Sequence, residues 1–254
     1  MSALELFFLG APEYRRNGVP VSLAPAKATA LLAYLALTRT PHPREHLADL
    51  LWPDSLPDAA RKNLRNTLWA IRRNLGDDII HTDGEQVGLS PALWMDLHHF
   101  EALSGELTAP GLDVNWLENR LALYRGPFLE GLSTADAPEF ELWLVAERER
   151  LQLLYLRGLE KLIDLHRQAG DWPAVVSVAR RALGIDNLRE PVYRALIEAL
   201  ARQGNRGEAA RQYQRLRDLL AQELSVAPLP ETEALYQAVL NGSLPDTPAP
   251  VSGR

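Results

Sequence analysis

The first 25 residues combine short apolar runs with turn-forming residues, a pattern that predicts β-strands. Leu4–Leu9 is largely apolar, and Asn17-Gly18 is the dipeptide most favoured in a two-residue hairpin turn. After this turn, apolar side chains alternate at Val19, Val21 and Leu23, which is the period of a half-buried strand. We therefore expect a small antiparallel sheet at the start of the chain.

Three helices are predicted next. Apolar residues recur at helical spacing over Ala26–Thr38. Pro43 is suited to the first position of a second helix, whose apolar stripe extends to Trp52. A third helix is expected from about 57 to 75, because Gly76 is a typical C-terminal stop. It would be about 28 Å long.

A second hairpin is expected after the third helix. Ile79–Ile80 and Val87–Leu89 read as its strands, with a polar tip over His81–Glu85. The order of helix, turn, long helix and hairpin is that of a helix-turn-helix followed by a wing.

From Trp116 to Leu240 the pattern becomes helical almost throughout, and it repeats. Gly170-Asp171 and Gly204-Asn205 each interrupt a pair of helices, 34 residues apart. The same shift aligns Val175 with Ala209, Ala179 with Tyr213, and Ala182 with Leu216. A helix–turn–helix period of this length is that of tetratricopeptide repeats, so this region is predicted to be TPR-like. The fold class expected is mainly α with a small antiparallel β part.

Composition narrows the class of protein. The chain has 254 residues, of which 46% are hydrophobic and 24% charged, and the formal net charge is −6. Its longest apolar stretch, Ala30–Leu37, is far shorter than the roughly 20 residues that span a bilayer. The absence of cysteine excludes disulfides, thiol catalysis and cysteine-ligated metals. These features predict a cytoplasmic protein with no membrane partner.

Positive charge is concentrated on the predicted third helix. Five of the ten Lys and Arg residues in the first 100 positions lie between Arg61 and Arg73, a window without any acid. On a helical wheel they share one sector with two further residues; the full set is Arg61, Lys62, Arg65, Asn66, Trp69, Arg72 and Arg73. The apolar residues form a separate stripe. Such a helix can enter the major groove of DNA, where Arg pairs with guanine and Asn with adenine.

A solvated surface face is the simpler interpretation of this cluster. A solvated face normally mixes both signs of charge, however, and this one does not. Trp69 is unusual in pure solvent and fits a core edge, a base or sugar contact, or a domain interface.

These residues resemble SARP-type bacterial transcriptional activators, which combine an OmpR-like winged helix with a bacterial transcriptional activator domain. The matching stretches in the first part are Leu9-Gly10, Arg44-Glu45, Leu50-Leu51-Trp52-Pro53, Asn63-Leu64-Arg65 and Ile71-Arg72-Arg73. In the second part they are Leu123–Leu129, Trp143, Glu147-Arg148, Arg150-Leu151 and Glu223–Val226.

The resemblance implies a winged helix over 1–95 and an activator domain over 96–241. Residues 242–254 contain three prolines and show no periodicity, which predicts a disordered Pro-rich tail. The resemblance also implies a sequence-specific activator that binds direct repeats in double-stranded DNA as a homodimer and contacts RNA polymerase. The long helix would carry the groove-facing set given above, with His81 and Thr82 at the wing tip.

Other chemistry finds little support in the sequence. His42, His46 and Asp49 have one-face metal spacing only if the second helix begins early, and no fourth ligand is evident. No P-loop, dinucleotide fingerprint, serine elbow or HExxH motif occurs. We expect no enzyme activity, no metal and no cofactor.

One rival hypothesis stays open. A TPR-like adaptor whose winged helix does not read DNA would fit the acidic wing tip, with Asp83 and Glu85, and the overall negative charge.

Overall fold

The structure, a computed structural model, describes residues 4–244. The chain divides into two compact units, which are described separately. The first comprises the residues up to Glu106 together with Asn119–Leu154, and the second comprises Leu107–Glu118 and the residues from Tyr155 on. Most of the predicted Pro-rich tail, residues 245–254, lies outside the described residues.

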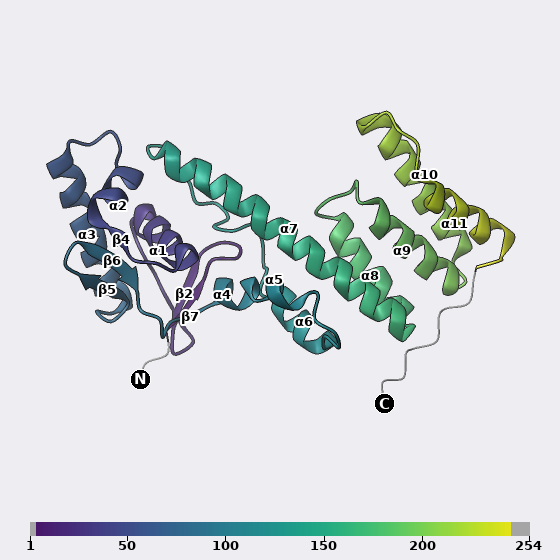
Figure 1. Ribbon diagram of the computed structural model, residues 1–254, viewed down its shortest axis with the longest axis horizontal. Coiled ribbons are helices and arrows are strands. Elements are labelled where there is room, and N and C mark those ends of the chain that lie inside the picture. Colours follow the sequence, from purple (N-terminus) through teal and green to yellow (C-terminus); the bar gives the residue numbers. More distant parts are fainter. Residues whose placement is uncertain (1–3, 245–254) are drawn as a thin grey trace. The chain divides into compact units, whose positions relative to one another are not determined.

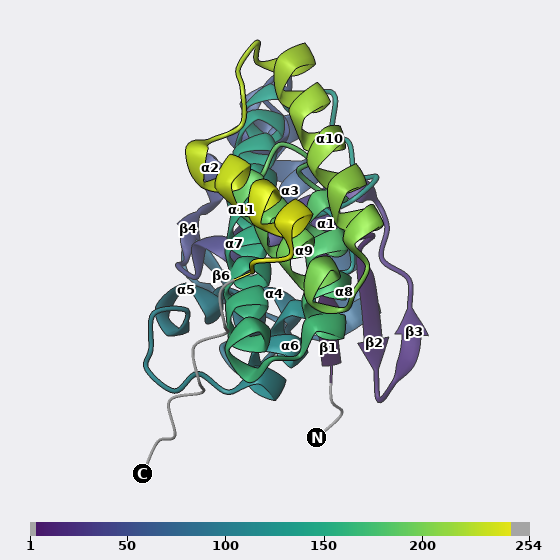
Figure 2. The same cartoon turned by 90° about the vertical axis from the view of Figure 1, so that its right-hand side faces the viewer.

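The first unit opens with the predicted hairpin. Strands β1 (Leu4–Phe7), β2 (Glu13–Arg16) and β3 (Val19–Val21) pair antiparallel, and Figure 2 shows β2 beside β3. Asn17 and Gly18 both have positive φ, as a tight hairpin turn requires. The sheet has the order β3-β2-β1-β7, and β7 (Trp94–Met95) lies parallel to β1, a pairing that the sequence does not predict.

The predicted helices follow (Figure 1). They are α1 (Ala26–Thr38), α2 (Arg44–Leu51) and α3 (Pro57–Leu75). The first and third have the predicted bounds, whereas α2 begins one residue later than expected. Pro43 is its N-cap, because His42–Pro43 forms strand β4.

Strands β5 (Ile80–Asp83) and β6 (Gln86–Leu89) form the second hairpin, and β4 completes this sheet in the order β4-β6-β5. The turn is shorter than the sequence indicated. His81 pairs with Gly88 and Thr82 with Val87, so both lie within β5 and not at the tip. The expected place of these two residues at the tip is therefore wrong.

The buried carboxylate of Asp96 joins the first sheet to the helix that follows it. Asp96 begins α4 (Asp96–Glu101), which is followed by the short α5 (Leu103–Glu106). It accepts hydrogen bonds from the backbone N–H groups of Phe8 at 2.9 Å, Leu9 at 3.0 Å and Leu97 at 2.7 Å. Three backbone donors thus end on one side chain that is 1% exposed.

An irregular segment between α6 (Val114–Leu121) and α7 (Pro138–Ala169) packs against the end of β1. The N–H of Leu129 donates to Phe8 O at 2.9 Å, and the N–H of Gly10 donates to Pro127 O at 3.2 Å. Gly10 has φ +112°, and a Cβ there would lie 3.2 Å from the Cβ of Arg125. Helical periodicity alone gave no sign of this segment, which belongs to the first unit.

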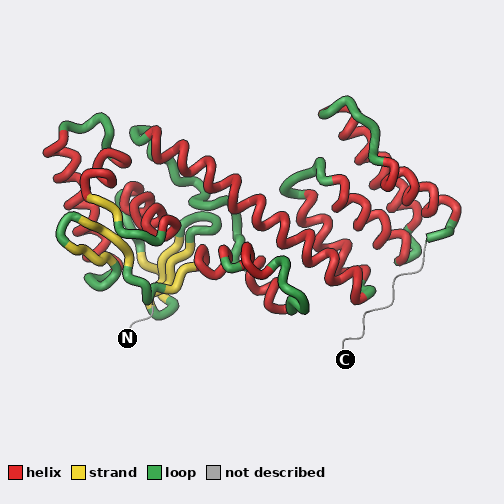
Figure 3. Tube along the Cα trace, in the orientation of Figure 1, coloured by secondary structure: helices red, strands yellow, loops and turns green. Residues whose placement is uncertain are grey.

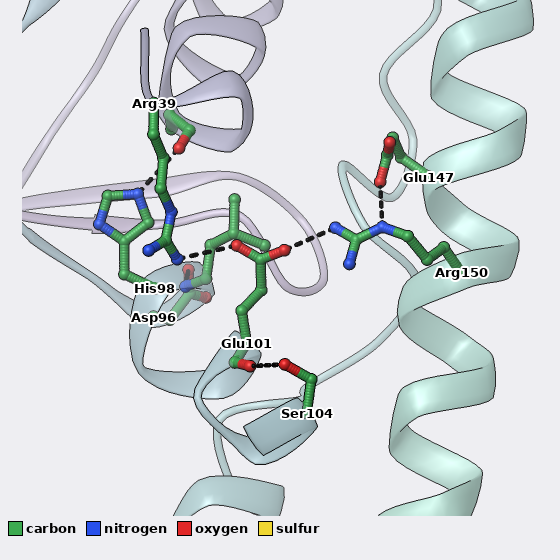
Figure 4. A network of polar contacts seen from close by, with 9 residues as sticks. Arg39, Asp96, His98, Glu101, Ser104, Glu147 and Arg150 are labelled. Atoms are coloured by element: carbon green, nitrogen blue, oxygen red, sulfur yellow. Dashed lines mark hydrogen bonds and ion pairs between the residues drawn. The ribbon is translucent and has the colours of Figure 1, made fainter.

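A series of ion pairs connects the first part of α7 to α4 and to the end of α1 (Figure 4). Glu101 accepts from Arg39 at the end of α1 at 2.9 Å and from Arg150 on α7 at 2.6 Å. Arg150 also pairs with Glu147 at 2.6 Å. The early part of α7 is therefore tied to the same body as α1 and α4.

The burial of the Asp96 carboxylate can be tested through the pH dependence of the protein's stability. Burial raises the pKa of Asp96 from 3.8 to about 6, although the three N–H donors and Arg125 act to lower it. A raised native pKa means that the folded state holds the proton more tightly than the unfolded state, so stability falls as pH rises from about 4 through 6. Relative to Asp96→Asn, we expect the wild-type protein to lose about 2 kcal/mol over this range. Urea unfolding of both proteins at pH 4.5 and 7 measures it, and parallel pH curves would contradict the burial argument.

The second unit is helical over its described residues (Figure 3). After the last part of α7 come α8 (Trp172–Leu183), α9 (Glu190–Arg202), α10 (Arg206–Glu223) and α11 (Pro230–Asn241). The residues aligned by the 34-residue shift are all buried: Val175, Ala179, Ala182, Ala209, Tyr213 and Leu216.

The repeat extends to the backbone. The N–H of Asp171 donates to His166 O at 2.9 Å, and 34 residues later the N–H of Asn205 donates to Leu200 O at 2.9 Å. Gly170 and Gly204 both have positive φ. The predicted fold class is confirmed: a winged helix is followed by TPR-like helices.

Candidate nucleic-acid interface

The candidate interface is built on α3, whose two sides differ sharply. Pro57 occupies the first turn, where its missing N–H costs no helical hydrogen bond, and Gly76 ends the helix with φ +107°. One side is buried in the first unit, as the wheel predicted; its members are Ala60, Leu64, Leu68, Ile71 and Leu75. Burial of this stripe fixes which side of the helix faces outward.

The outward side carries the predicted basic set. Six of its members are exposed: Arg61, Lys62, Arg65, Asn66, Trp69 and Arg73. Arg72 is half-buried. Arg72 and Arg73 lie in the last turn of α3, where cations interact favourably with the helix dipole. The structure thus brings the seven α3 residues to one outward side.

These cations are largely free of carboxylate partners. Arg61 contacts Glu45 at 3.4 Å and Asp58 at 3.8 Å, but all three side chains are more than half exposed, so these pairs are weak. Among residues 4–244, no ion pair involves Lys62, Arg65, Arg72 or Arg73. The positive potential of this side therefore remains available to an anionic partner.

Arg44, at the start of α2, belongs to the same surface, although the sequence pattern did not single it out. Its N–H donates to Glu85 O at 2.8 Å, and its Nε lies 3.5 Å from Gly84 O, so it is held beside the turn of the wing. It lines a hollow of about 350 Å³ together with Arg65, Trp69, Arg72, Arg73 and others. Its sequence signals were its place in the Arg44-Glu45 stretch that carries the family resemblance and its position directly after Pro43, the N-cap of α2.

The wing contributes mixed chemistry. His81 is exposed, and the hydroxyl of Thr82 lies 3.4 Å from Arg72 Nη2, which connects β5 to α3. Asp83 and Glu85 are exposed at the turn. The carboxylates of the wing turn would repel phosphate. A polyanion is therefore expected to contact α3 and Arg44, which carry the positive charge of this surface, and not the turn of the wing.

The histidines considered as metal ligands have other contacts. His46 Nε2 lies 2.9 Å from the Tyr34 hydroxyl, and His42 Nε2 lies 2.8 Å from Thr38 Oγ1. Burial, and secondarily His46, lowers the pKa of His42. In the part of the chain that the structure describes, no group of three or more His, Cys, Asp or Glu side chains is placed to hold a metal ion.

Comparison with known proteins identifies the family. The bacterial transcriptional activator domain family matches residues 95–240, more than half of the chain. The chain belongs to this family. The matched region begins in β7, and its residues 95–106 and 119–154 lie in the first compact unit with the basic helix.

Similar proteins agree with this assignment. "Regulatory protein AfsR" of Streptomyces griseus is 29% identical over 244 residues, which cover 93% of this chain but only 23% of AfsR. "Transcriptional regulatory protein MoaR1" of Mycobacterium tuberculosis is 26% identical, covering 94% of this chain and 79% of MoaR1. "Regulatory protein DnrI" of Streptomyces peucetius is 26% identical, with 93% and 92% covered. The chain thus spans about a quarter of the length of AfsR.

The resemblance to SARP-type activators is confirmed by these relatives, which are transcriptional regulators of that group. A solved structure of Mycobacterium tuberculosis EmbR in complex with a low-affinity phosphopeptide has a TM-score of 0.72 and 24% identity. The match covers 97% of this chain and 67% of EmbR, and it supports the fold. Within residues 4–244, no helix has the length and apolar character needed to cross a membrane.

Proposed function

We propose that this member of the bacterial transcriptional activator domain family is a sequence-specific activator that binds double-stranded DNA through α3. The observation that carries the proposal is the outward side of this helix, where four cations have no carboxylate partner among the described residues. A B-DNA major groove is about 12 Å wide and admits one helix. We assign no catalytic role to the chain.

The roles of the side chains follow from their positions. Arg65 and Asn66, midway along the exposed side, are placed for base edges, since Arg matches guanine and Asn matches adenine. Arg61 and Lys62, near the start of the helix, would meet phosphates, as would Arg72 beside the wing. Arg44 would add a phosphate contact from outside the recognition helix. His81 and Thr82, on β5, would approach the sugar–phosphate backbone of the DNA.

The remaining assignments rest on family membership. We propose a winged-helix domain over 1–95 and an activator domain over 96–241 that joins two protomers on direct repeats and contacts RNA polymerase. A homodimer, at least on DNA, in the cytoplasm of a bacterial cell is the corresponding assembly.

Salt dependence tests the electrostatic part of this proposal. The probe is a duplex that carries the upstream region of the chain's own gene, and the readout is a gel shift at several salt concentrations. With four phosphate contacts, those of Arg44, Arg61, Lys62 and Arg72, in each of two protomers, we expect log K to fall against log[salt] with a slope of about −7. Doubling the salt from 0.1 to 0.2 M then weakens binding about 130-fold. Binding seen only below physiological salt would favour the adaptor hypothesis instead.

A further inference from the structure

Trp69 is an exposed aromatic side chain in the middle of the basic surface. It is 59% exposed, so it is not part of the core of the first unit. It lies one turn after Arg65 and one turn before Arg73, on the side of α3 that faces outward. The indole lines the same hollow as Arg65 and Arg73, so it is accessible to whatever ligand the cationic surface binds.

Arg73 is held against this indole. Its guanidinium carbon lies 5.0 Å from the centre of the Trp69 ring, within the range of a cation–π contact. Arg73 is exposed and has no ion pair among residues 4–244. Stacking restricts the flexible arginine before any ligand arrives, so less conformational entropy is lost when its donors bind. The two side chains therefore act as one pre-organised unit.

We propose that Trp69 and Arg73 together read a thymine next to a guanine in the major groove. This inference rests on the proposed DNA binding and names the base step that this pair recognises. Arg73 can donate two hydrogen bonds to O6 and N7 of guanine, whereas adenine and cytosine each present an amino donor there. The indole has a large apolar face, and thymine is the base that presents a methyl group in this groove. Stacked side chains fit stacked neighbouring bases.

The first experiment identifies the preferred DNA sequence by selection. The full chain selects from a library of randomised DNA duplexes, alongside Trp69→Ala, Trp69→Phe, Arg73→Ala and Arg73→Lys. The wild-type motif is expected to contain adjacent thymine and guanine. Arg73→Ala and Arg73→Lys should lose the guanine, because Lys keeps the charge but not the bidentate fork. Trp69→Ala should lose the thymine, and Trp69→Phe should retain it.

The second experiment removes a single methyl group from the DNA. In the best selected duplex, uracil replaces the thymine, which leaves base pairing unchanged. We expect about fourfold weaker binding by the wild-type protein, from the apolar transfer free energy of one methyl group. Trp69→Ala should bind the thymine and uracil duplexes equally. Lys62→Ala is the matched control: it lowers overall affinity and keeps the fourfold ratio.

The outcomes distinguish a failure of sequence-specific DNA binding from a failure of the roles assigned to Trp69 and Arg73. If no sequence is enriched by the wild-type chain, the proposed sequence-specific binding itself fails. If a motif is enriched but uracil binds as well as thymine, or Arg73→Ala leaves the guanine preference intact, the Trp69–Arg73 assignment is overturned while DNA binding stands. Thermal unfolding of each variant, expected to be unchanged because both side chains are exposed, excludes misfolding as the cause.

Discussion

Replacing Arg65 by Ala is expected to weaken binding to the selected DNA duplex by about 1–3 kcal/mol, or roughly 5- to 150-fold. Arg65 is exposed at the middle of α3 and has no ion pair in the described part of the chain. Its side chain is therefore free for guanine, and its removal leaves no internal partner unpaired. Fluorescence anisotropy at fixed salt measures the change, with circular dichroism to show that α3 is retained.

The matched control is Arg211→Ala on α10. Arg211 is also exposed, but it pairs with Glu208 at 2.6 Å and lies in the second unit. Both substitutions remove one positive charge from the chain, so a long-range effect of net charge would be common to them. We expect little change for Arg211→Ala. Equal losses for the two variants would contradict a specific role for Arg65.

Replacing Asp96 by Ala is expected to cost about 3–5 kcal/mol of unfolding free energy. The substitution leaves three backbone N–H groups, those of Phe8, Leu9 and Leu97, without their acceptor in a buried site. Each such group costs about 1–3 kcal/mol, and partial relaxation reduces the sum. Urea denaturation at pH 7 measures the loss through the shift of the midpoint.

Asp77→Ala provides the comparison for this loss. Asp77 is exposed just after α3, and a surface substitution of this kind changes stability by about 0.5 kcal/mol or less. A loss below about 1 kcal/mol for Asp96→Ala would show that the end of β1 is held by other contacts, such as those to the segment near Phe128.

Strong local signals made the long helices predictable. Both α1 and α3 have regular apolar stripes and clear ends, with Gly76 closing α3. Strands β4 and β7 have two residues each, too few to show any periodicity. The role of Asp96 was not predictable either, because its partners Phe8 and Leu9 lie 88 and 87 residues away in the sequence. Nothing local marks such a contact.

In the candidate site, too, some positions were predictable from the sequence and others were not. The wheel was sufficient to place the basic residues on the outward side, because burial of Leu64, Leu68 and Ile71 fixes the rotation of α3. Arg44 reaches the surface through a different element, and only the register of β4 with β6 brings it beside the wing. The register of the second hairpin, which the sequence does not determine, likewise places His81 and Thr82 within β5 and not at the expected tip.

DNA cleavage from a reagent attached to α3 tests the central claim most directly. The chain contains no cysteine, so Asp58→Cys, in the first turn of α3, introduces a single thiol that can carry an iron chelate. The Asp58 side chain is fully exposed and has no assigned DNA contact, so the label leaves the recognition residues in place. We predict cleavage of the selected duplex at a few adjacent nucleotides within the bound sequence, and no specific cleavage from the same reagent on Arg211→Cys. A labelled Asp58→Cys protein that shifts the duplex but leaves it uncut, while Arg211→Cys cuts it, would show that DNA binds elsewhere.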